Sequence, residues 1–196
     1  FSVKSRLSRT ITVKLSYRDG KHRYHPKTSR DGRDWTPLAD DAYSHDESGA
    51  TLQLQVGPKP LWVAGQELLG GKQLNAWIDE MGRLAFAKID IVGRSILKQP
   101  IRRLVLTHGR ASGSVFILGR QHPPEVTGSL GLINFVETLA GESEAAQEFR
   151  RSFDVVVVPL INPDGVQQGH WRHNMRGVDL NRDWGLFKQP ETRAVA

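Results

Sequence analysis

The chain has 196 residues, of which 38% are hydrophobic, and it contains no apolar run near the roughly 20 residues that cross a bilayer. It has no cysteine, which excludes disulfides and thiolate metal ligands. The net charge of +6 raises the possibility of nucleic-acid binding, but the basic residues are scattered and no nucleic-acid motif accompanies them, so we expect a solvated basic surface, with neither a nucleic acid nor a membrane as partner.

Residues 1–57 are predicted to form a small β-sandwich. Apolar side chains alternate with polar ones in two stretches, 11–17 (Ile11, Val13, Leu15, Tyr17) and 52–56 (Leu52, Leu54, Val56), which is typical of half-buried strands. Asp19-Gly20 and the segment 30–33 are turn signals. The stiff segment 57–60 (Gly-Pro-Lys-Pro) then predicts a domain boundary, with a second domain over 61–196.

The second part of the chain has the pattern of an α/β domain. Helices are expected over 66–81, with an interruption at Gly70-Gly71, and over 132–140, with Gly141 as the stop. Continuous apolar runs at 104–106, 115–118 and 155–161 predict strands that are buried on both faces of a sheet. The last residues, from Pro190, read as the first turn of another helix.

His122 and Glu125 are a candidate metal-binding pair. They follow the predicted strand 115–118, and functional groups collect at the carboxyl ends of strands in open α/β sheets. Zinc accepts an imidazole nitrogen and a carboxylate oxygen, and a catalytic zinc usually has three protein ligands and a water. The two prolines between the ligands stiffen the loop. Alone, the pair could equally be a surface histidine and a glutamate at a helix N-terminus.

Two further segments carry polar motifs. Residues 162–165 (Asn-Pro-Asp-Gly) predict a tight turn with a mainly structural role at the mouth of the site. Residues 172–182 hold Arg172, Arg176 and Arg182 together with Asp179 and Asn181. Guanidinium groups bind carboxylates bidentately and stabilise oxyanions, so this segment is a candidate for both tasks, although each arginine alone could be a surface charge.

In this order the motifs resemble the M14 family of zinc carboxypeptidases, and most of all its cytosolic carboxypeptidase-like branch with its bacterial members. The motifs are Gly-Arg-Gln-His-Pro-Pro-Glu at 119–125, Asn-Pro-Asp-Gly at 162–165, and Arg-His-Asn-Met-Arg-Gly-Val-Asp-Leu-Asn-Arg at 172–182. The resemblance implies a small β-sandwich followed by an α/β catalytic domain with a mixed, largely parallel central sheet. It also implies Zn²⁺ as cofactor and the C-terminus of a peptide or protein as substrate.

The resemblance implies a role for each matching residue. His122 and Glu125 are expected to be zinc ligands, and Asp179 is expected to accept a hydrogen bond from the other ring nitrogen of His122. Arg172 is expected to stabilise the oxyanion of the tetrahedral intermediate. Asn181 and Arg182 are expected to bind the terminal carboxylate of the substrate.

Two parts of the family's apparatus are not found in the sequence. The third ligand, a histidine, and the general base, a glutamate, are expected beyond Ala196, because both ends of the chain read as cuts. His108, His170 and His173 are expected to be ordinary residues. We therefore expect a metallocarboxypeptidase whose 196 residues alone are inactive. Two alternatives stay open, a zinc-dependent deacylase of N-acyl amino acids and a module that binds C-termini without cleaving them.

Overall fold

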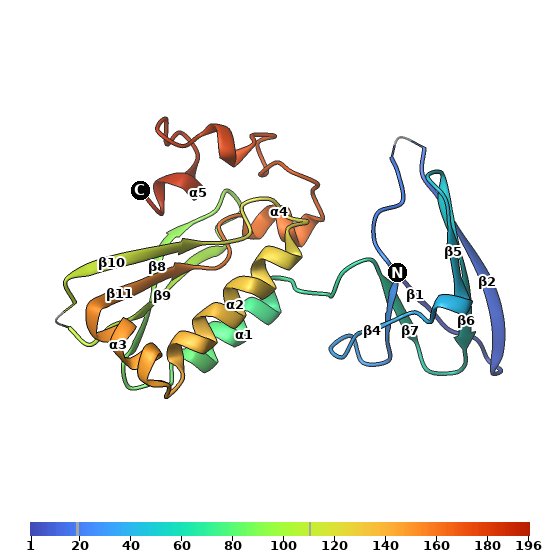
Figure 1. Cartoon of the computed structure of the whole chain (residues 1–196). Helices are drawn as coiled ribbons and strands as arrows, with labels where there is room; N and C mark the ends of the chain where they lie inside the picture. Colours follow the sequence, from blue (N-terminus) through green and yellow to red (C-terminus); the bar gives the residue numbers. More distant parts are fainter. Residues whose placement is uncertain (19, 110) are drawn as a thin grey trace. The chain divides into compact units, whose positions relative to one another are not determined.

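The computed structural model describes residues 1–18, 20–109 and 111–196, which form two compact units, residues 1–68 and 69–196 (Figure 1). Within these described ranges, no helix has the length and apolar content needed to cross a membrane. The predicted turn at Asp19-Gly20 includes Asp19 and so lies outside the described residues.

The first unit is a β-sandwich of two antiparallel sheets, with strand orders β1-β7-β3-β4 and β2-β6-β5. Its elements are β1 (Ser2–Val3), β2 (Arg9–Ser16), β3 (Lys27–Ser29), β4 (Thr36–Pro37), the 3-10 helix η1 (Asp40–Ala42), β5 (Tyr43–His45), β6 (Gly49–Val56) and β7 (Leu61–Ala64). Leu52 and Leu54 of β6 pack with Leu61 and Val63 of β7 in a core between the sheets. The predicted alternation is seen in β2 and β6, but Tyr17 lies beyond the end of β2 and is exposed.

The stiff segment 57–60 joins two strands of the sandwich. It leads from β6 into β7, and β7 pairs with β1 and β3 of the first unit. A proline-rich connection suits a change of sheet as well as a change of domain. The boundary between the two compact units lies between Leu68 and Leu69, further along the chain than the sequence indicated.

The second unit has the expected α/β architecture around a mixed four-stranded sheet of order β10-β11-β9-β8. Its strands are β8 (Ala87–Arg94), β9 (Pro100–Leu106), β10 (Gly113–Leu118) and β11 (Phe153–Val158). The prediction of a largely parallel sheet is wrong for the described strands, because only β10 and β11 pair in parallel. The five residues between β8 and β9 allow only a hairpin, whereas a helical crossover separates β10 from β11.

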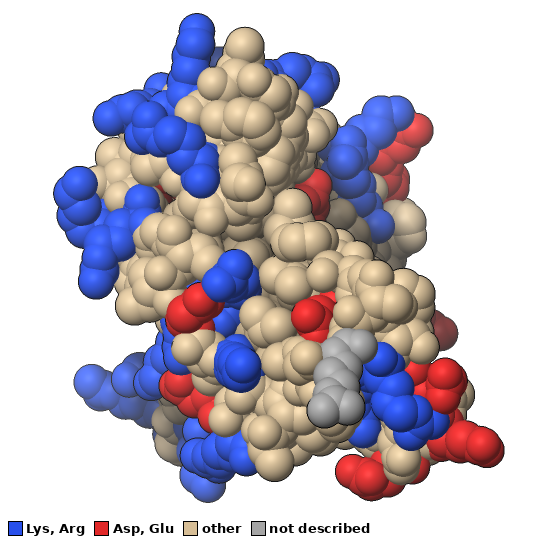
Figure 2. All heavy atoms as spheres, turned by 90° about the vertical axis from the view of Figure 1, so that its left-hand side faces the viewer, with Lys and Arg blue, Asp and Glu red and all other residues tan. Residues whose placement is uncertain are grey.

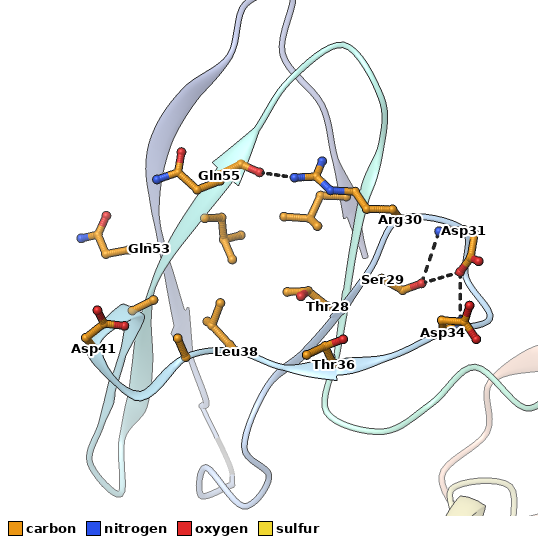
Figure 3. A pocket seen from close by; sticks show the side chains of 14 residues that line it. Thr28, Ser29, Arg30, Asp31, Asp34, Thr36, Leu38, Asp41, Gln53 and Gln55 are labelled. Carbon is orange, nitrogen blue, oxygen red and sulfur yellow. Dashed lines mark hydrogen bonds between the residues drawn. The ribbon is translucent and has the colours of Figure 1, made fainter.

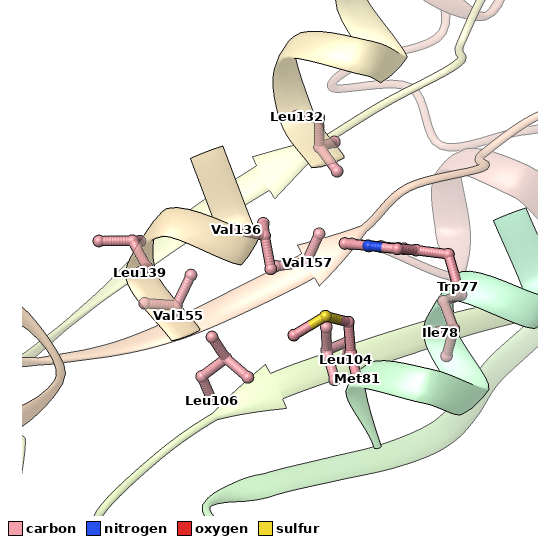
Figure 4. Packing of buried hydrophobic residues seen from close by; sticks show 10 residues of the cluster. All are labelled: Trp77, Ile78, Met81, Leu104, Leu106, Leu132, Val136, Leu139, Val155 and Val157. Carbon is pink, nitrogen blue, oxygen red and sulfur yellow. The ribbon is translucent and has the colours of Figure 1, made fainter. Parts of the chain in front are cut away.

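Helices α1 (Gly71–Met81) and α2 (Val126–Ala140) cover one face of this sheet, and α3 (Glu144–Ser152) precedes β11. Figure 4 shows side chains of both helices meeting those of β9 and β11. The buried members are Trp77, Ile78, Met81, Leu104, Leu106, Leu132, Val136, Leu139, Val155 and Val157. The glycine pair at 70–71 begins α1 instead of interrupting it, since Gly70 is the N-cap and its amide donates to Gln73 Oε1.

The C-terminal segment covers the other face at one end of the sheet (Figure 1). It contains α4 (Pro163–Gln168), the 3-10 helix η2 (Leu180–Arg182) and α5 (Pro190–Arg193), so the helix predicted at Pro190 is confirmed. Leu180 packs there with Ile101 and Val158. The run 115–118 is not buried on both faces, because β10 is an edge strand and Phe116 is 66% exposed.

Candidate metal and carboxylate site

Two loops leave the sheet side by side at the carboxyl ends of β10 and β11. Hydrogen bonds continue past the strands, from Gly119 N to Val158 O at 2.9 Å and from Ile161 N to Gly119 O at 3.1 Å. A side chain at Gly119 would place its Cβ 2.9 Å from Pro159 O, so glycine permits this close approach. The loop 119–125 is thereby fixed over the edge of the sheet where functional groups are expected.

His122 and Glu125 come together as the sequence predicted for a metal-binding pair. His122 Nδ1 lies 2.7 Å from Glu125 Oε1. The imidazole is nearly buried, with 10% of its side chain exposed, while the Glu125 side chain is 53% exposed. Glu125 is the N-cap of α2, so the start of the helix positions this carboxylate toward solvent beside the ring.

Asp179 connects this pair to the segment 172–182. Its Oδ1 accepts from His122 Nε2 at 2.9 Å and from the Asn181 amide at 2.9 Å, and its Oδ2 accepts from Arg172 Nε at 2.7 Å. Burial raises the pKa of Asp179, but these hydrogen bonds and the charge of Arg172 outweigh it and hold the pKa well below its usual range. Asp179 is therefore ionised and can only accept, so the hydrogen in its bond with His122 is on Nε2.

With Nε2 committed to Asp179, Nδ1 of His122 faces the Glu125 carboxylate 2.7 Å away. A ring nitrogen and a carboxylate oxygen at this distance can share either a proton or a metal ion. A nitrogen and an oxygen donor suit zinc, so the residues present fit that metal.

Among the described residues, no group of three His, Cys, Asp or Glu side chains is placed to hold a metal ion. His170 Nδ1 instead contacts the backbone oxygen of His173 at 3.0 Å, and the ring of His108 packs near Phe86. Neither of these rings joins the pair His122 and Glu125. Among the described residues, His122 and Glu125 thus remain a candidate pair without a third such side chain grouped with them.

Arg172, Asn181 and Arg182 present polar groups at the same site. Arg172 uses only Nε to bind Asp179, and its side chain is 42% exposed. Asn181 and Arg182 lie in η2 and are exposed, and within the described ranges no hydrogen bond of either side chain is seen. Guanidinium and amide groups free in this way can bind a carboxylate from solution.

Arg120 is a functional neighbour that the sequence did not reveal. It adopts a left-handed backbone conformation (φ 52°) that is uncommon for a residue with a side chain, and it is 6% exposed. Nε donates to Pro123 O and Nη1 to Leu69 O, both at 2.7 Å. Burial lowers the pKa of Arg120, while the nearby charge of Glu125 raises it. The guanidinium therefore braces the loop between His122 and Glu125.

Asn162 is not part of a tight turn, and the prediction for 162–165 is wrong in that respect. Pro163 is the first residue of α4, and the Asn162 side chain caps this helix by accepting from the Gly165 amide at 2.9 Å. Its Nδ2 also donates to Gln121 O at 3.4 Å and to His173 O at 3.3 Å. One buried amide thus contacts the neighbours of both His122 and Arg172.

Asn174 shapes the segment that carries Arg172 and Asp179. Its Oδ1 accepts from the amides of Arg176 and Val178, and its Nδ2 donates to the side chains of Gln189 and Glu191. The side chain is buried, with 1% exposure. The buried Asn174 side chain therefore fixes the loop through these four hydrogen bonds, none of which goes to His122 or Asp179.

Asp183 holds the start of α5 against the same segment. Its carboxylate accepts from the amides of Lys188 and Gln189 and from Thr192 Oγ1. Burial raises the pKa of Asp183, but these hydrogen bonds outweigh it, and the pKa lies below its usual range.

On the face drawn in Figure 2, the charged side chains do not gather in a single patch. Lys and Arg side chains stand there in separate groups, with carboxylates between some of them and uncharged residues over much of the centre. The Lys and Arg side chains visible on this face thus do not form one continuous basic patch.

Comparison with known proteins identifies the family. A zinc carboxypeptidase family model matches residues 74–194. Cytosolic carboxypeptidase 2 of Danio rerio is 32% identical over 114 residues, 55% of this chain and 16% of that protein. Cytosolic carboxypeptidase 6 of Caenorhabditis elegans is 29% identical over 119 residues, 57% of this chain and 26% of that protein.

Solved structures share the fold. A metallo-carboxypeptidase from Burkholderia cenocepacia has a TM-score of 0.83 at 24% identity, over 99% of this chain and 55% of that chain. A Pseudomonas aeruginosa metallo-carboxypeptidase in complex with (2-guanidinoethylmercapto)succinic acid has a TM-score of 0.76 at 21% identity, over 98% of this chain and 57% of that chain. The chain spans about half the length of these structures and far less of the curated relatives. By its sequence motifs, its fold and the family match, this chain belongs to the M14 family of zinc carboxypeptidases.

Proposed function

We propose that this chain carries part of the active site of a zinc-dependent metallocarboxypeptidase, which hydrolyses the C-terminal peptide bond of peptides or proteins. The observation that supports the proposal best is the line of contacts from Glu125 through His122 and Asp179 to Arg172. It joins a pair of metal-binding atoms to a guanidinium group that remains partly free. The family match and the carboxypeptidase relatives favour the same activity.

We assign His122 Nδ1 and Glu125 Oε1 as zinc ligands, with Asp179 holding the ring of His122 through Nε2. Zinc, when bound, would supply a water of lowered pKa and polarise the scissile carbonyl. The exposed part of Arg172 would donate hydrogen bonds to the oxyanion that forms from that carbonyl. Asp179 keeps Arg172 in place for this task by accepting from its Nε.

We assign substrate binding to Asn181 and Arg182. Both side chains are exposed and belong to the 3-10 helix η2, two and three residues after its N-cap Asp179, whose Oδ1 accepts from the Asn181 amide. A terminal carboxylate can be held bidentately by the guanidinium group, with the amide as a further donor. Specificity for a free C-terminus would follow from this clamp. We also propose that the first unit, the β-sandwich, is a separate domain placed before the catalytic one.

The 196 residues alone are proposed to be inactive. A catalytic zinc site normally has three protein ligands, and among the described residues no group of three His, Cys, Asp or Glu side chains could hold a metal ion. This observation also favours one second function, binding of C-termini without cleavage, because the clamp of Asn181 and Arg182 does not depend on a third ligand.

The test compares peptides with free and amidated C-termini, analysed by mass spectrometry after incubation with zinc. For the chain within a catalytic domain of the length of its relatives, we expect release of single residues from free C-termini only. For the 196 residues alone, we expect weak binding of the free peptide and no cleavage, with loss of binding in Arg182→Ala. Cleavage of N-acyl amino acids but of no peptide would contradict the proposal and identify a deacylase.

A further inference from the structure

We propose that the open edge of β6 in the first unit, residues 53–56, binds an extended basic peptide segment as an added β-strand. This function is separate from the site in the second unit and does not depend on it. Three observations carry the proposal: an unpaired stretch of strand, a groove beside it, and carboxylates around that groove.

The unpaired stretch arises because β5 is shorter than β6. β2 pairs with β6 along its whole length, from Gly49 to Val56. On the other side, β5 pairs only with residues 50–52. In the part of the chain that the structure describes, no strand pairs with residues 53–56 on that side. This stretch of β6 thus leaves main-chain groups without a strand partner on that side.

A bond from Arg30 shows which groups face the open edge. Arg30 Nη2 donates to Gln55 O at 2.9 Å, across the side that β5 leaves open (Figure 3). Since N–H and C=O of one residue point to the same side of an antiparallel strand, the amide of Gln55 faces outward too, as do both groups of Gln53 two residues earlier. These are the groups that strand addition uses.

A groove of about 690 Å³ runs beside this edge. Figure 3 shows β6 on one side of it and the residues of β3 and β4 on the other. Its apolar floor is formed by Leu38, Leu54 and Leu61. In an added strand every second side chain would point into this groove, and four residues of strand extend about 13 Å. The groove can therefore receive the inward side chains of a segment that matches the open stretch.

The charges around the groove select for basic residues. Asp31, Asp34 and Asp41 line it, and Arg30 is the one cation among its lining residues, although the chain as a whole carries +6. The Asp31 carboxylate is engaged by Ser29 and by the amides of Arg33 and Asp34, so it mainly holds the turn. Asp34 and Asp41 are exposed and positioned for Lys or Arg side chains of the added strand.

Arg30 occupies the place of the proposed ligand. Its exposed guanidinium satisfies Gln55 O in the absence of another strand, which is one way in which proteins protect an open edge. An added strand would replace it with a backbone N–H. Removing the side chain should therefore favour the ligand, by vacating the carbonyl and by removing a positive charge.

The experiment uses the whole chain and the peptide TKVKVKT-amide with a fluorophore on its N-terminal amine, whose amidated end cannot occupy a site for C-terminal carboxylates. Binding is followed by fluorescence anisotropy at low salt. TEVEVET-amide with the same fluorophore is the charge control. Two further lysine peptides carry N-methyl groups on alternate residues, one on the odd and one on the even positions. Only one of these sets can face β6, because alternate N–H groups point to opposite sides of a strand.

We expect the lysine peptide to bind at least about tenfold more tightly than the glutamate peptide. One methylated peptide should lose about tenfold or more, and the other should bind within about threefold of the parent. Arg30→Ala should tighten binding several-fold. Gln55→Pro, which removes the outward N–H, should abolish binding that Gln55→Ala retains.

Other results would overturn the proposal. Strand addition would be excluded if the lysine peptide did not bind at millimolar concentration, or if both methylated peptides lost the same affinity. Selection for basic segments would be excluded if the glutamate peptide bound as tightly as the lysine peptide. If Gln55→Pro does not fold, the methylated peptides decide the matter with the wild-type protein.

Discussion

Exchanging Asp179 for asparagine would remove an acceptor from the centre of the candidate site. The carboxylate accepts from His122 Nε2 at 2.9 Å and from Arg172 Nε at 2.7 Å, through different oxygens. An amide has one oxygen and one NH₂ donor, so in either orientation one neighbour faces a donor, and the negative charge is lost. We expect zinc affinity to fall about 10- to 100-fold, or about 1.4–2.8 kcal/mol.

The assay is a zinc titration followed by isothermal titration calorimetry, which reads binding in every variant. With two ligands, we expect the wild-type chain to bind more weakly than micromolar, and Asp179→Asn to shift the curve by the stated factor. His122→Ala should abolish saturable binding. Arg182→Ala is the matched control, because this exposed side chain is not a ligand, and it should leave the curve within about twofold. An unchanged affinity in Asp179→Asn would refute the role given to Asp179, and submicromolar binding by the wild type would reveal a recruited third ligand.

Three further predictions concern the residues that support the site. Arg120→Met should leave two carbonyl oxygens without their buried donor, at a cost of about 2–3 kcal/mol, and lower the melting temperature by about 4–12 °C in calorimetry. Asn174→Ala should accelerate hydrogen exchange of the Val178 amide, which donates to Asn174 Oδ1 at 3.1 Å. The pKa of Asp183 is lower in the folded protein than in the unfolded chain. Its ionised carboxylate therefore stabilises the fold at pH values above the pKa of the unfolded chain. This stabilisation is lost as the pH falls through the pKa of the folded protein. The difference in melting temperature between wild type and Asp183→Asn should therefore shrink as the pH falls from 7 toward 2.

Each of these has an opposing outcome. Arg120→Lys should recover only part of the loss, because one ammonium does not reproduce two fixed guanidinium bonds, and full recovery would show that charge alone matters. Asn181→Ala, at an exposed position, should leave exchange of the Val178 amide unchanged. A difference for Asp183→Asn that is constant with pH would show that its ionisation does not contribute to stability.

The sequence predicted the elements whose signal is local. The alternation in β2 and β6 and the helical spacing in α1 and α2 directly reflect which side chains are buried. Strand pairing could be predicted less well from the sequence, because an apolar run indicates burial but not which strands lie beside it. The run 115–118 was therefore expected to be buried on both faces of the sheet, whereas β10 is an edge strand of the described sheet and Phe116 is exposed. Composition also favoured a turn at 162–165, where Pro163 instead starts α4 and Asn162 caps it.

The candidate site could be predicted where residue types have a distinctive chemistry. The contact of Asp179 with His122 was expected from the motifs, whereas the contact of Asp179 with Arg172 is seen only in the structure. Arg120 and Asn174 could not be found in this way, since their roles depend on distant backbone groups such as Leu69 O. A buried arginine or asparagine reads in a sequence like any surface residue.

The bridging amide of Asn162 has a consequence for how this part of the protein opens. Its side chain bonds to Gly165 at the start of α4, to Gln121 beside His122, and to His173 beside Arg172. The three segments thus share one buried anchor, and the detachment of any of them leaves a polar group of Asn162 with fewer partners. We therefore expect both loops and α4 to unfold locally as one cooperative unit, so that their slowest amides exchange with a common opening free energy. A ligand bound to either loop would then protect the other from proteolysis.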